Sequence, residues 1–129
     1  MSDLNPLRND EGTLPDLVKY IRKELGVKLS TLILGVNSPT LKSWTEGKAL
    51  TQQHKRFVFA LHYVVATLRT VLDPMEAKIW LVSHSDYLYG IPAKELRMRP
   101  EDVKYAAENR ISRGEYYDTI HERMEGGEQ

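Results

Sequence analysis

Histidines and a short Ser-His-Asp run are the residues of this 129-residue chain that could do metal or hydrolytic chemistry. His54 and His62 lie eight apart in a helical pattern, which separates them by roughly 12 Å, too far for one ion. Neither His84 nor His121 has a neighbour at ligand spacing. Ser, His and Asp also occur within 83–86, but a triad is assembled by geometry, and no nucleophile elbow accompanies them. We therefore expect no metal, no cofactor and no enzyme.

A polar stretch with two apolar anchors, residues 35–48 (GVNSPTLKSWTEGK), is the most informative part of the sequence. Gly35 and Val36 predict a turn, and Leu41 and Trp44, three apart, predict the buried edge of a short helix. The other side chains are mostly small or basic: hydroxyls and amides can read base edges, and lysines can contact phosphates. The predicted DNA-binding residues in this stretch are Asn37, Ser38, Thr40, Lys42, Ser43 and Lys48.

The stretch resembles the turn and recognition helix of Xre-type helix-turn-helix regulators. The shared pattern is Gly-Val, four small polar residues, an apolar residue, two polar residues, Trp, two polar residues, Gly and Lys. The resemblance implies that the helix enters the major groove of DNA. The preceding segment, residues 27–34, departs from the family, because it is short and apolar and has Ser30 and Thr31 where an apolar and a small residue are expected. Lys28 alone remains there to contact the phosphate backbone, and it completes the predicted DNA-binding set.

A second resemblance covers residues 66–112. Around its tryptophan this region looks like the C-terminal domain of the Xre/MbcA/ParS group, the antitoxins that are paired with RES-domain toxins. The positions that carry the resemblance are Ala77, Trp80, Leu81, Leu88, Pro92 and Leu96. The proline comes one residue early, and the usual glycine pair before it is reduced to Gly90. Together the two motifs span about residues 13–112 in the order that the family has.

The family resemblance implies a protein partner. Such antitoxins bind a toxin that degrades NAD, cover its active-site cleft with their C-terminal domain or tail, and often repress their own operon. Tyrosines gather in the C-terminal half of this chain, and tyrosine is enriched at partner interfaces. The candidate partner-binding residues are Tyr87, Tyr89, Tyr116, Tyr117 and Glu122. Two alternatives remain open: a phage or bacterial repressor without a toxin partner, and a structural interaction module with a non-functional helix-turn-helix.

Charge is unevenly distributed along the chain, although Lys plus Arg and Asp plus Glu both number 18. Residues 1–72 hold ten basic and six acidic residues, a net of +4, and residues 73–129 hold eight basic and twelve acidic ones, a net of −4. Two halves of opposite sign suit two partners, such as operator DNA and a protein. The absence of cysteine excludes disulfide scaffolds and thiol sites. No apolar run approaches the roughly 20 residues of a membrane span, and the start of the chain is unlike a signal peptide, so we expect a cytoplasmic protein without membrane contact.

Helical spacing of apolar residues, with no alternating strand pattern, predicts an all-α fold. The expected parts are a flexible arm at 1–12, a helix-turn-helix region at 13–50, a central helix at 51–72, a Trp-containing C-terminal domain at 73–112 and an acidic tail at 113–129. A first helix capped by Thr13 should stop at Gly26. Apolar residues on more than one face of the central helix, including Phe57, Phe59 and Tyr63, predict a homodimer through that helix.

Capping and breaking residues set the predicted ends of the shorter helices. These residues are Asn37 or Ser38, Gly47, Asp73 and Pro100. They predict two short helices within 28–46, a helix at 75–82, one or two turns at 93–98 and a last helix at about 100–111.

Overall fold

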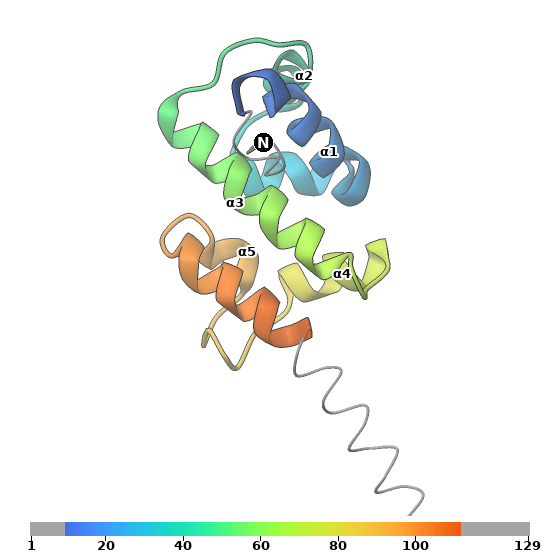
Figure 1. The fold of residues 1–129 in the computed structure, drawn as a ribbon, viewed down its shortest axis with the longest axis vertical. Coiled ribbons are helices and arrows are strands. Elements are labelled where there is room, and N and C mark those ends of the chain that lie inside the picture. The colour runs from blue at the N-terminus through green and yellow to red at the C-terminus, as the bar shows by residue number, and fades with distance from the viewer. Residues whose placement is uncertain (1–9, 112–129) are drawn as a thin grey trace, which may run out of the picture.

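The computed structural model describes residues 10–111 and folds them into six helices, with no strand among them, so the all-α fold class is confirmed. The helices are α1 (Asp10–Leu34), α2 (Ser38–Thr45), α3 (Gln52–Leu68), α4 (Pro74–Val82), α5 (Pro92–Glu95) and a last helix at residues 100–111. α3 runs diagonally through the molecule, with α1 and α2 at one end and α4, α5 and the last helix at the other (Figure 1). None of the described helices is long and apolar enough to cross a membrane.

Gly26 divides α1 into two helical segments, the second of which is residues 27–34. Its backbone, with φ 86° and ψ 161°, is non-helical, and glycine adopts this conformation at little cost. The predicted stop at Gly26 is therefore confirmed. The predicted start is wrong, because α1 begins at Asp10, so residues 10–12 are helical and Thr13 is not the cap. The rest of the predicted arm lies outside the described residues.

α3 forms the centre of the hydrophobic core. Its buried side chains are Phe57, Val58, Ala60, Leu61, Val64, Val65 and Leu68. The helix is capped by Thr51, whose hydroxyl oxygen accepts a hydrogen bond from the His54 N–H at 3.1 Å. It ends four residues before the predicted end, because a turn at 69–72 closes the chain ahead of Asp73-Pro74. The periodicity alone could not mark that end, since Leu72 is buried from within the turn.

The homodimer through α3 is predicted because the helix has apolar residues on more than one face. In the described part of the chain, other residues of the same chain cover those faces. Phe57 is buried, and Phe59 packs half-buried against the core. The Tyr63 hydroxyl donates a hydrogen bond to Glu108, and the Lys104 ammonium lies 5.5 Å from the centre of the Tyr63 ring. The chain itself covers the apolar surface that was expected to need a second copy. The homodimer stays a prediction without this support.

A capping box begins α4, the first helix of the C-terminal end of the molecule. The Asp73 carboxylate accepts from the Glu76 N–H at 2.8 Å, and the Glu76 carboxylate accepts from the Asp73 N–H at 2.9 Å. α4 begins at Pro74, one residue before the predicted start, because proline fits the first position of a helix. The predicted turns at 93–98 appear as the one-turn α5 and a following turn, and the last helix covers 100–111 as predicted.

Candidate functional site

The segment predicted to be a helix-turn-helix consists of two helices joined by a turn. Residues 27–34 form the first helix, and Gly35, with φ 72°, turns the chain. The Gly35 N–H donates to the Thr31 carbonyl at 2.8 Å, and the Val36 N–H donates to the same carbonyl at 3.1 Å. Two bonds to one carbonyl close the first helix tightly, and this fixes the direction in which α2 leaves the turn.

α2, the candidate recognition helix, is capped and anchored as predicted. The Asn37 side-chain oxygen accepts from the Thr40 N–H at 2.9 Å. Leu41 and Trp44 are buried along one edge, and Gly47, with φ 98°, follows the end of the helix. The cap uses the side-chain oxygen of Asn37. The side-chain amide nitrogen therefore stays available to donate a hydrogen bond to a base.

Short polar side chains and the longer Lys42 make up the outer face of α2. Ser38 and Lys42 are exposed, and Thr40 and Ser43 are half-buried. The Ser43 hydroxyl donates to the Thr40 carbonyl at 2.7 Å, so it can only accept from a base. The Lys42 ammonium lies 3.8 Å from the Glu46 carboxylate, and both side chains are mostly exposed. Such a surface pair is weak in water, and a phosphate can replace the carboxylate.

The two remaining predicted DNA-binding residues lie beside α2 in the chain. Lys28 is exposed near the start of residues 27–34, and Lys48 is exposed just after the end of α2. The Lys48 N–H donates to the Ser43 carbonyl at 3.0 Å, which holds its backbone against the helix. Neither lysine has an acidic side chain within ion-pair distance among residues 10–111. Both ammonium groups are therefore available to phosphates.

Ser30 accounts for one departure from the helix-turn-helix pattern. Its side chain is fully buried, and its hydroxyl donates to the Ile21 carbonyl at 3.4 Å, across the kink in α1. A polar residue therefore occupies a core position with one long hydrogen bond to the backbone. Leu32, on the same segment, is 74% exposed, so the apolar composition of residues 27–34 is only partly explained by the core.

The loop at 85–90 carries the two candidate partner-binding tyrosines that the structure describes, and it lies at the opposite end of the molecule from α2 (Figure 1). The Ser85 N–H donates to the Gly90 carbonyl and the Tyr89 N–H to the Ser85 carbonyl, both at 2.7 Å. Tyr87 is exposed and Tyr89 is 87% exposed, whereas Leu88 between them is buried. Tyr89 has φ 57°, a left-handed conformation that is strained for a bulky residue.

Arg99 braces this loop from the start of the last helix. Its guanidinium donates to the Leu88 carbonyl at 2.6 Å and to the Glu95 carboxylate at 3.0 Å. The loop is thereby fixed while its tyrosines point outward, which suits a preformed contact surface. The other three predicted partner-binding residues lie outside the described residues: Tyr116, Tyr117 and Glu122.

Sequence reasoning missed an exposed apolar stripe on α4. Met75, Ile79 and Val82 recur at helical spacing, and about half of each side chain is exposed. Their spacing could have indicated one face, but the same spacing is typical of a buried stripe. Trp80, next to Ile79 in the chain, is half-buried, whereas Leu81 is fully buried.

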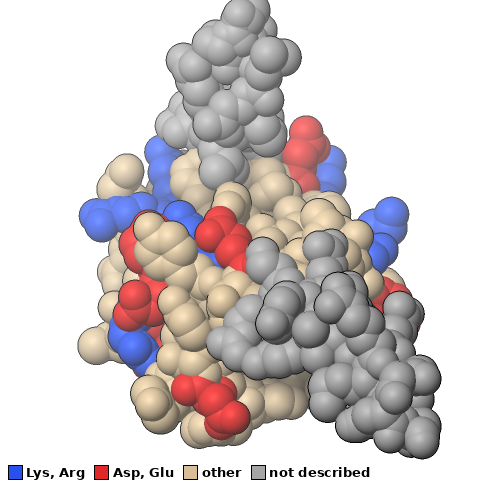
Figure 2. All heavy atoms as spheres, turned by 60° about the horizontal axis from the view of Figure 1, so that its bottom comes forward, with Lys and Arg blue, Asp and Glu red and all other residues tan. Residues whose placement is uncertain are grey.

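An apolar groove of about 490 Å³ lies between residues 27–34 and the C-terminal helices. Its lining includes Leu29, Leu32, Ile33, Val82, Ile91 and Met98. Figure 2 shows the C-terminal end of the molecule, where charged side chains of both signs are scattered around a broad uncharged area. Exposed apolar surface among mixed charges is typical of a protein-binding face rather than of a nucleic-acid-binding face.

The Ser-His-Asp run does not form a triad. The Ser83 hydroxyl donates to the Ile79 carbonyl at 2.6 Å. His84 Nε2 lies 3.6 Å from the Asp86 carboxylate, and both side chains are exposed to solvent. Within residues 10–111 no group of three His, Cys, Asp or Glu side chains could hold a metal ion.

Ionisable side chains tie the helices that hold α2. The Arg69 guanidinium donates to the Glu24 carboxylate at 2.6 Å, and this bond raises the pKa of Arg69. The hydrogen bond to Glu108, followed by burial, raises the pKa of Tyr63. Burial lowers the pKa of His62, whose Nδ1 has no hydrogen-bond partner among residues 10–111. These groups join α1 and the last helix to α3 and have structural roles.

Comparison of the chain with protein-family models, curated proteins and solved structures finds no match. The resemblance to helix-turn-helix antitoxins therefore rests on the residues quoted for it.

Proposed function

We propose that this chain is a helix-turn-helix DNA-binding regulator, and that it is a type II antitoxin that neutralises a RES-type NAD-degrading toxin and represses transcription. The observation that carries the proposal is the outer face of α2. A capped, core-anchored helix presents Ser38, Thr40, Lys42 and Ser43, with no acidic residue in its first turn. Short polar side chains let a helix approach the major groove closely, and lysines contact phosphates.

An anisotropy titration with DNA from upstream of the protein's own reading frame tests the DNA-binding part. Lys42→Gln should weaken binding to every sequence and reduce the salt slope by about one unit, because one phosphate contact is lost. Thr40→Ala should change the preference among sequences by roughly 1–3 kcal/mol at the affected base pair. Lys94→Gln, which removes an exposed lysine on α5, is the matched control and should change neither. If the folded wild-type chain binds no duplex at low salt, this part is wrong.

The ion pair on α2 offers a test in the opposite direction. Glu46→Gln should raise DNA affinity, because Lys42 then reaches a phosphate without giving up a carboxylate. The variant should change the free energy of unfolding by less than about 0.5 kcal/mol, since the pair is exposed. Thermal unfolding provides the control, and unchanged or weaker DNA binding would argue against contact between DNA and this part of α2.

The partner-binding part rests on the exposed apolar stripe of α4, on the braced loop at 85–90 and on the family resemblance. Fixed aromatic side chains are effective anchors in protein interfaces. In cells that co-express the product of the neighbouring reading frame, the wild-type chain should preserve NAD. Ile79→Asp and Tyr89→Ala should each reduce that protection, whereas Tyr105→Ala, at an exposed tyrosine of the last helix, should not. If all three variants protect NAD as well as the wild type does, then α4 and the loop at 85–90 do not form the partner-binding surface.

A repressor without a toxin partner is the second candidate, and the polar face of α2 favours it equally. It predicts sequence-specific DNA binding together with no interaction with the neighbouring gene product. A structural module with a non-functional helix-turn-helix is favoured by the exposed Leu32 on residues 27–34, and it predicts a folded chain that binds no DNA.

A further inference from the structure

The apolar groove between residues 27–34 and the C-terminal helices is open to solvent. Leu32 and Met98, which line it, are 74% and 79% exposed, and Val82 is about half exposed. Val82 also belongs to the exposed stripe of α4, so the two apolar surfaces meet at this residue. Exposed apolar surface in a groove is typical of a site that another segment or molecule covers.

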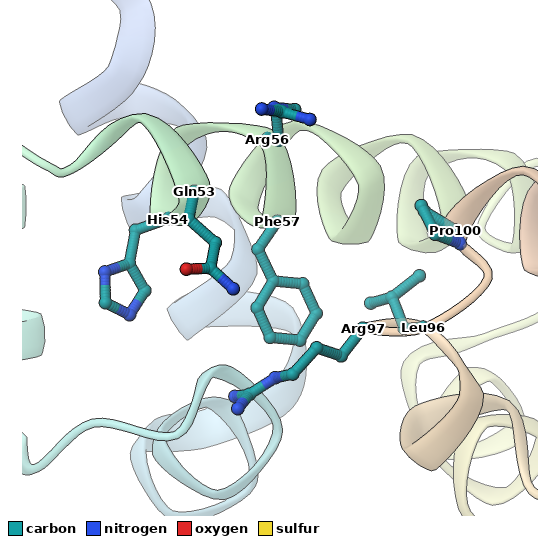
Figure 3. Close-up of a pocket in the computed structure, with 7 residues that line it drawn as sticks. All are labelled: Gln53, His54, Arg56, Phe57, Leu96, Arg97 and Pro100. Atoms are coloured by element: carbon teal, nitrogen blue, oxygen red, sulfur yellow. The ribbon is translucent and has the colours of Figure 1, made fainter.

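The charged residues that line the groove are both basic. They are Lys94 and Arg97, and neither has a carboxylate within ion-pair distance among residues 10–111. The Arg97 guanidinium carbon lies 5.1 Å from the centre of the Phe57 ring, and Figure 3 shows the Arg97 side chain below that ring. Contact with the ring holds this cation beside the apolar lining. An occupant that fits such a groove has one apolar face and carries negative charge.

The sequence that follows the last described helix contains a segment of this kind. Between Gly114 and Gly126, aromatic and aliphatic residues recur at helical spacing: Tyr116, Tyr117, Ile120 and Met124. Acidic residues recur at helical spacing on the opposite face: Glu115, Asp118, Glu122 and Glu125. The pattern predicts an amphipathic, acidic helix, and such a helix binds through its apolar face to an apolar groove.

The groove is within reach of this segment. The last helix begins two residues after Met98, which lines the groove, and continues to Ile111, about 17 Å further along its axis. A reversal at residues 112–115, which include Gly114, and a helix at 116–124 of about 13 Å can return most of that distance. Covalent linkage also gives the segment an effective concentration on the order of 1 mM. A segment of the same chain therefore has an advantage over a free partner of similar affinity.

We propose that residues 115–125 bind as an amphipathic helix in the apolar groove of their own chain. Ile120 and its apolar neighbours pack against Leu32 and Met98, and the negative charge of the segment faces the two basic residues of the lining. The contact covers the exposed side chain on residues 27–34 that the core does not cover. It joins the first helix of the helix-turn-helix to the C-terminal helices. It needs neither DNA nor a toxin, so it goes beyond the proposed function.

Disulfide cross-linking tests the proposal in the full chain, which has no cysteine of its own. Leu32→Cys combined with Ile120→Cys should form an intrachain disulfide, because the apolar face of the segment lies against Leu32. The reaction should be at least about fivefold faster than with Asp118→Cys or Glu122→Cys in place of Ile120→Cys. Those two control positions lie two residues before and two residues after Ile120, so the length of the linking chain cannot produce the difference.

A change in the groove should remove this preference. Met98→Asp places a charge in the apolar lining, and the chain should remain folded because Met98 is exposed. Met75→Asp, at a similarly exposed methionine of α4 outside the lining, is the matched control and should leave the preference intact. In a cysteine-free chain, the amides of residues 116–124 should exchange with deuterium at least about tenfold more slowly than in Met98→Asp. Thermal unfolding of each variant separates lost docking from lost folding.

Four results would overturn the proposal. Equal rates for the three cysteine pairs, or equal amide exchange of residues 116–124 with and without Met98→Asp, would mean that the segment does not dock in the groove. A disulfide that joins two chains, at a rate that rises with protein concentration, would assign the groove to the tail of a second copy. Protection of residues 116–124 that appears only with the product of the neighbouring reading frame would assign the segment to that partner. Cross-linking uses neither DNA nor toxin, so its outcome does not depend on the proposed function.

Discussion

The two ends of the molecule present different chemistry to their surroundings. At the helix-turn-helix end, Leu41 and Trp44 are buried and the outer face of α2 is short-chained and polar. At the other end, Met75, Ile79 and Tyr89 leave half or more of each side chain exposed. α1 packs on α3, the last helix contacts Tyr63 of α3, and buried residues of both ends belong to one core, so the difference lies in what each end presents and not in whether it has a core. Polar, water-accessible faces suit nucleic acid, whereas exposed apolar faces suit a protein that removes them from water.

Two surfaces of different chemistry therefore share one small core and are also linked to each other. Arg97 belongs to the C-terminal end by sequence, yet it contacts the Leu34 carbonyl, 63 positions earlier, at the turn of the helix-turn-helix. The experiments below ask whether the two ends fold as one unit, whether Arg97 links them, and whether each surface serves its own partner.

The largest expected effect comes from the shared core. Leu61 is fully buried in α3, and Leu61→Ala should lower the free energy of unfolding by about 2–5 kcal/mol through lost burial and a cavity. Urea unfolding should be followed in two single-tryptophan chains, one keeping Trp44 at the helix-turn-helix end and one keeping Trp80 at the other. The two transitions should coincide and should shift together in the variant. Separate transitions would mean that the ends are independent units.

A pair of glycines tests the link through Arg97. Gly35 and Gly47 both have positive φ, so an alanine at either should cost about 1–2 kcal/mol in backbone strain. A Cβ at Gly47 meets nothing within 4 Å, whereas one at Gly35 displaces Arg97. Gly35→Ala should therefore lower the melting temperature more than Gly47→Ala does. The excess should vanish in an Arg97→Gln background, and an excess that persists there would contradict the link.

His62, on α3, should make the free energy of unfolding of the chain depend on pH. Burial lowers its pKa below the ordinary histidine value of 6.5, so between the folded pKa and 6.5 the unfolded chain binds more protons than the folded chain. The free energy of unfolding should therefore rise with pH through that window, by at most about 1.4 kcal/mol per pH unit, and His62 should contribute fully above pH 6.5. Urea titrations at several pH values should give a flatter profile for His62→Gln. The exposed His84→Gln is the control, and an unchanged slope in His62→Gln would refute the assignment.

The smallest expected effect separates stability from binding at the loop of residues 85–90. Tyr89 has φ 57°, so Tyr89→Gly should relieve strain and raise the free energy of unfolding by up to about 1 kcal/mol. The same change removes an exposed aromatic ring, so affinity for the protein partner should fall. Tyr87→Gly, at a residue without positive φ, should lower stability instead. A Tyr89→Gly chain that is less stable than the wild type would show that the ring has a structural role.

Local signals in the sequence predicted the parts of the fold that depend on one or two residues. The stop at Gly26, the cap at Asn37, the glycine after α2 and the cap at Asp73 all follow from preferences of the backbone near helix ends. The buried pair Leu41 and Trp44 followed from spacing. These features do not depend on what packs against them.

The other features of the fold and of the candidate surfaces depend on tertiary contacts, which cannot be predicted from a single sequence. The exposed stripe that includes Met75 and Ile79 has the spacing of a buried one, and only the arrangement of the other helices decides which it is. The cover that Lys104 and Glu108 give to Tyr63 comes from a helix about 40 residues away in sequence, so α3 looked under-covered from its own pattern. The Arg97 contact with the turn has no local signal at all.

Amide chemical shifts of the nitrogen-15-labelled full chain, titrated with its upstream DNA, test most directly the claim that the two ends serve different partners. We expect changes at Ser38, Thr40, Lys42 and the neighbouring residues of 27–48, with the loop at 85–90 unaffected. Changes centred on Tyr87 and Tyr89, or no changes at any residue of the folded protein at low salt, would contradict it.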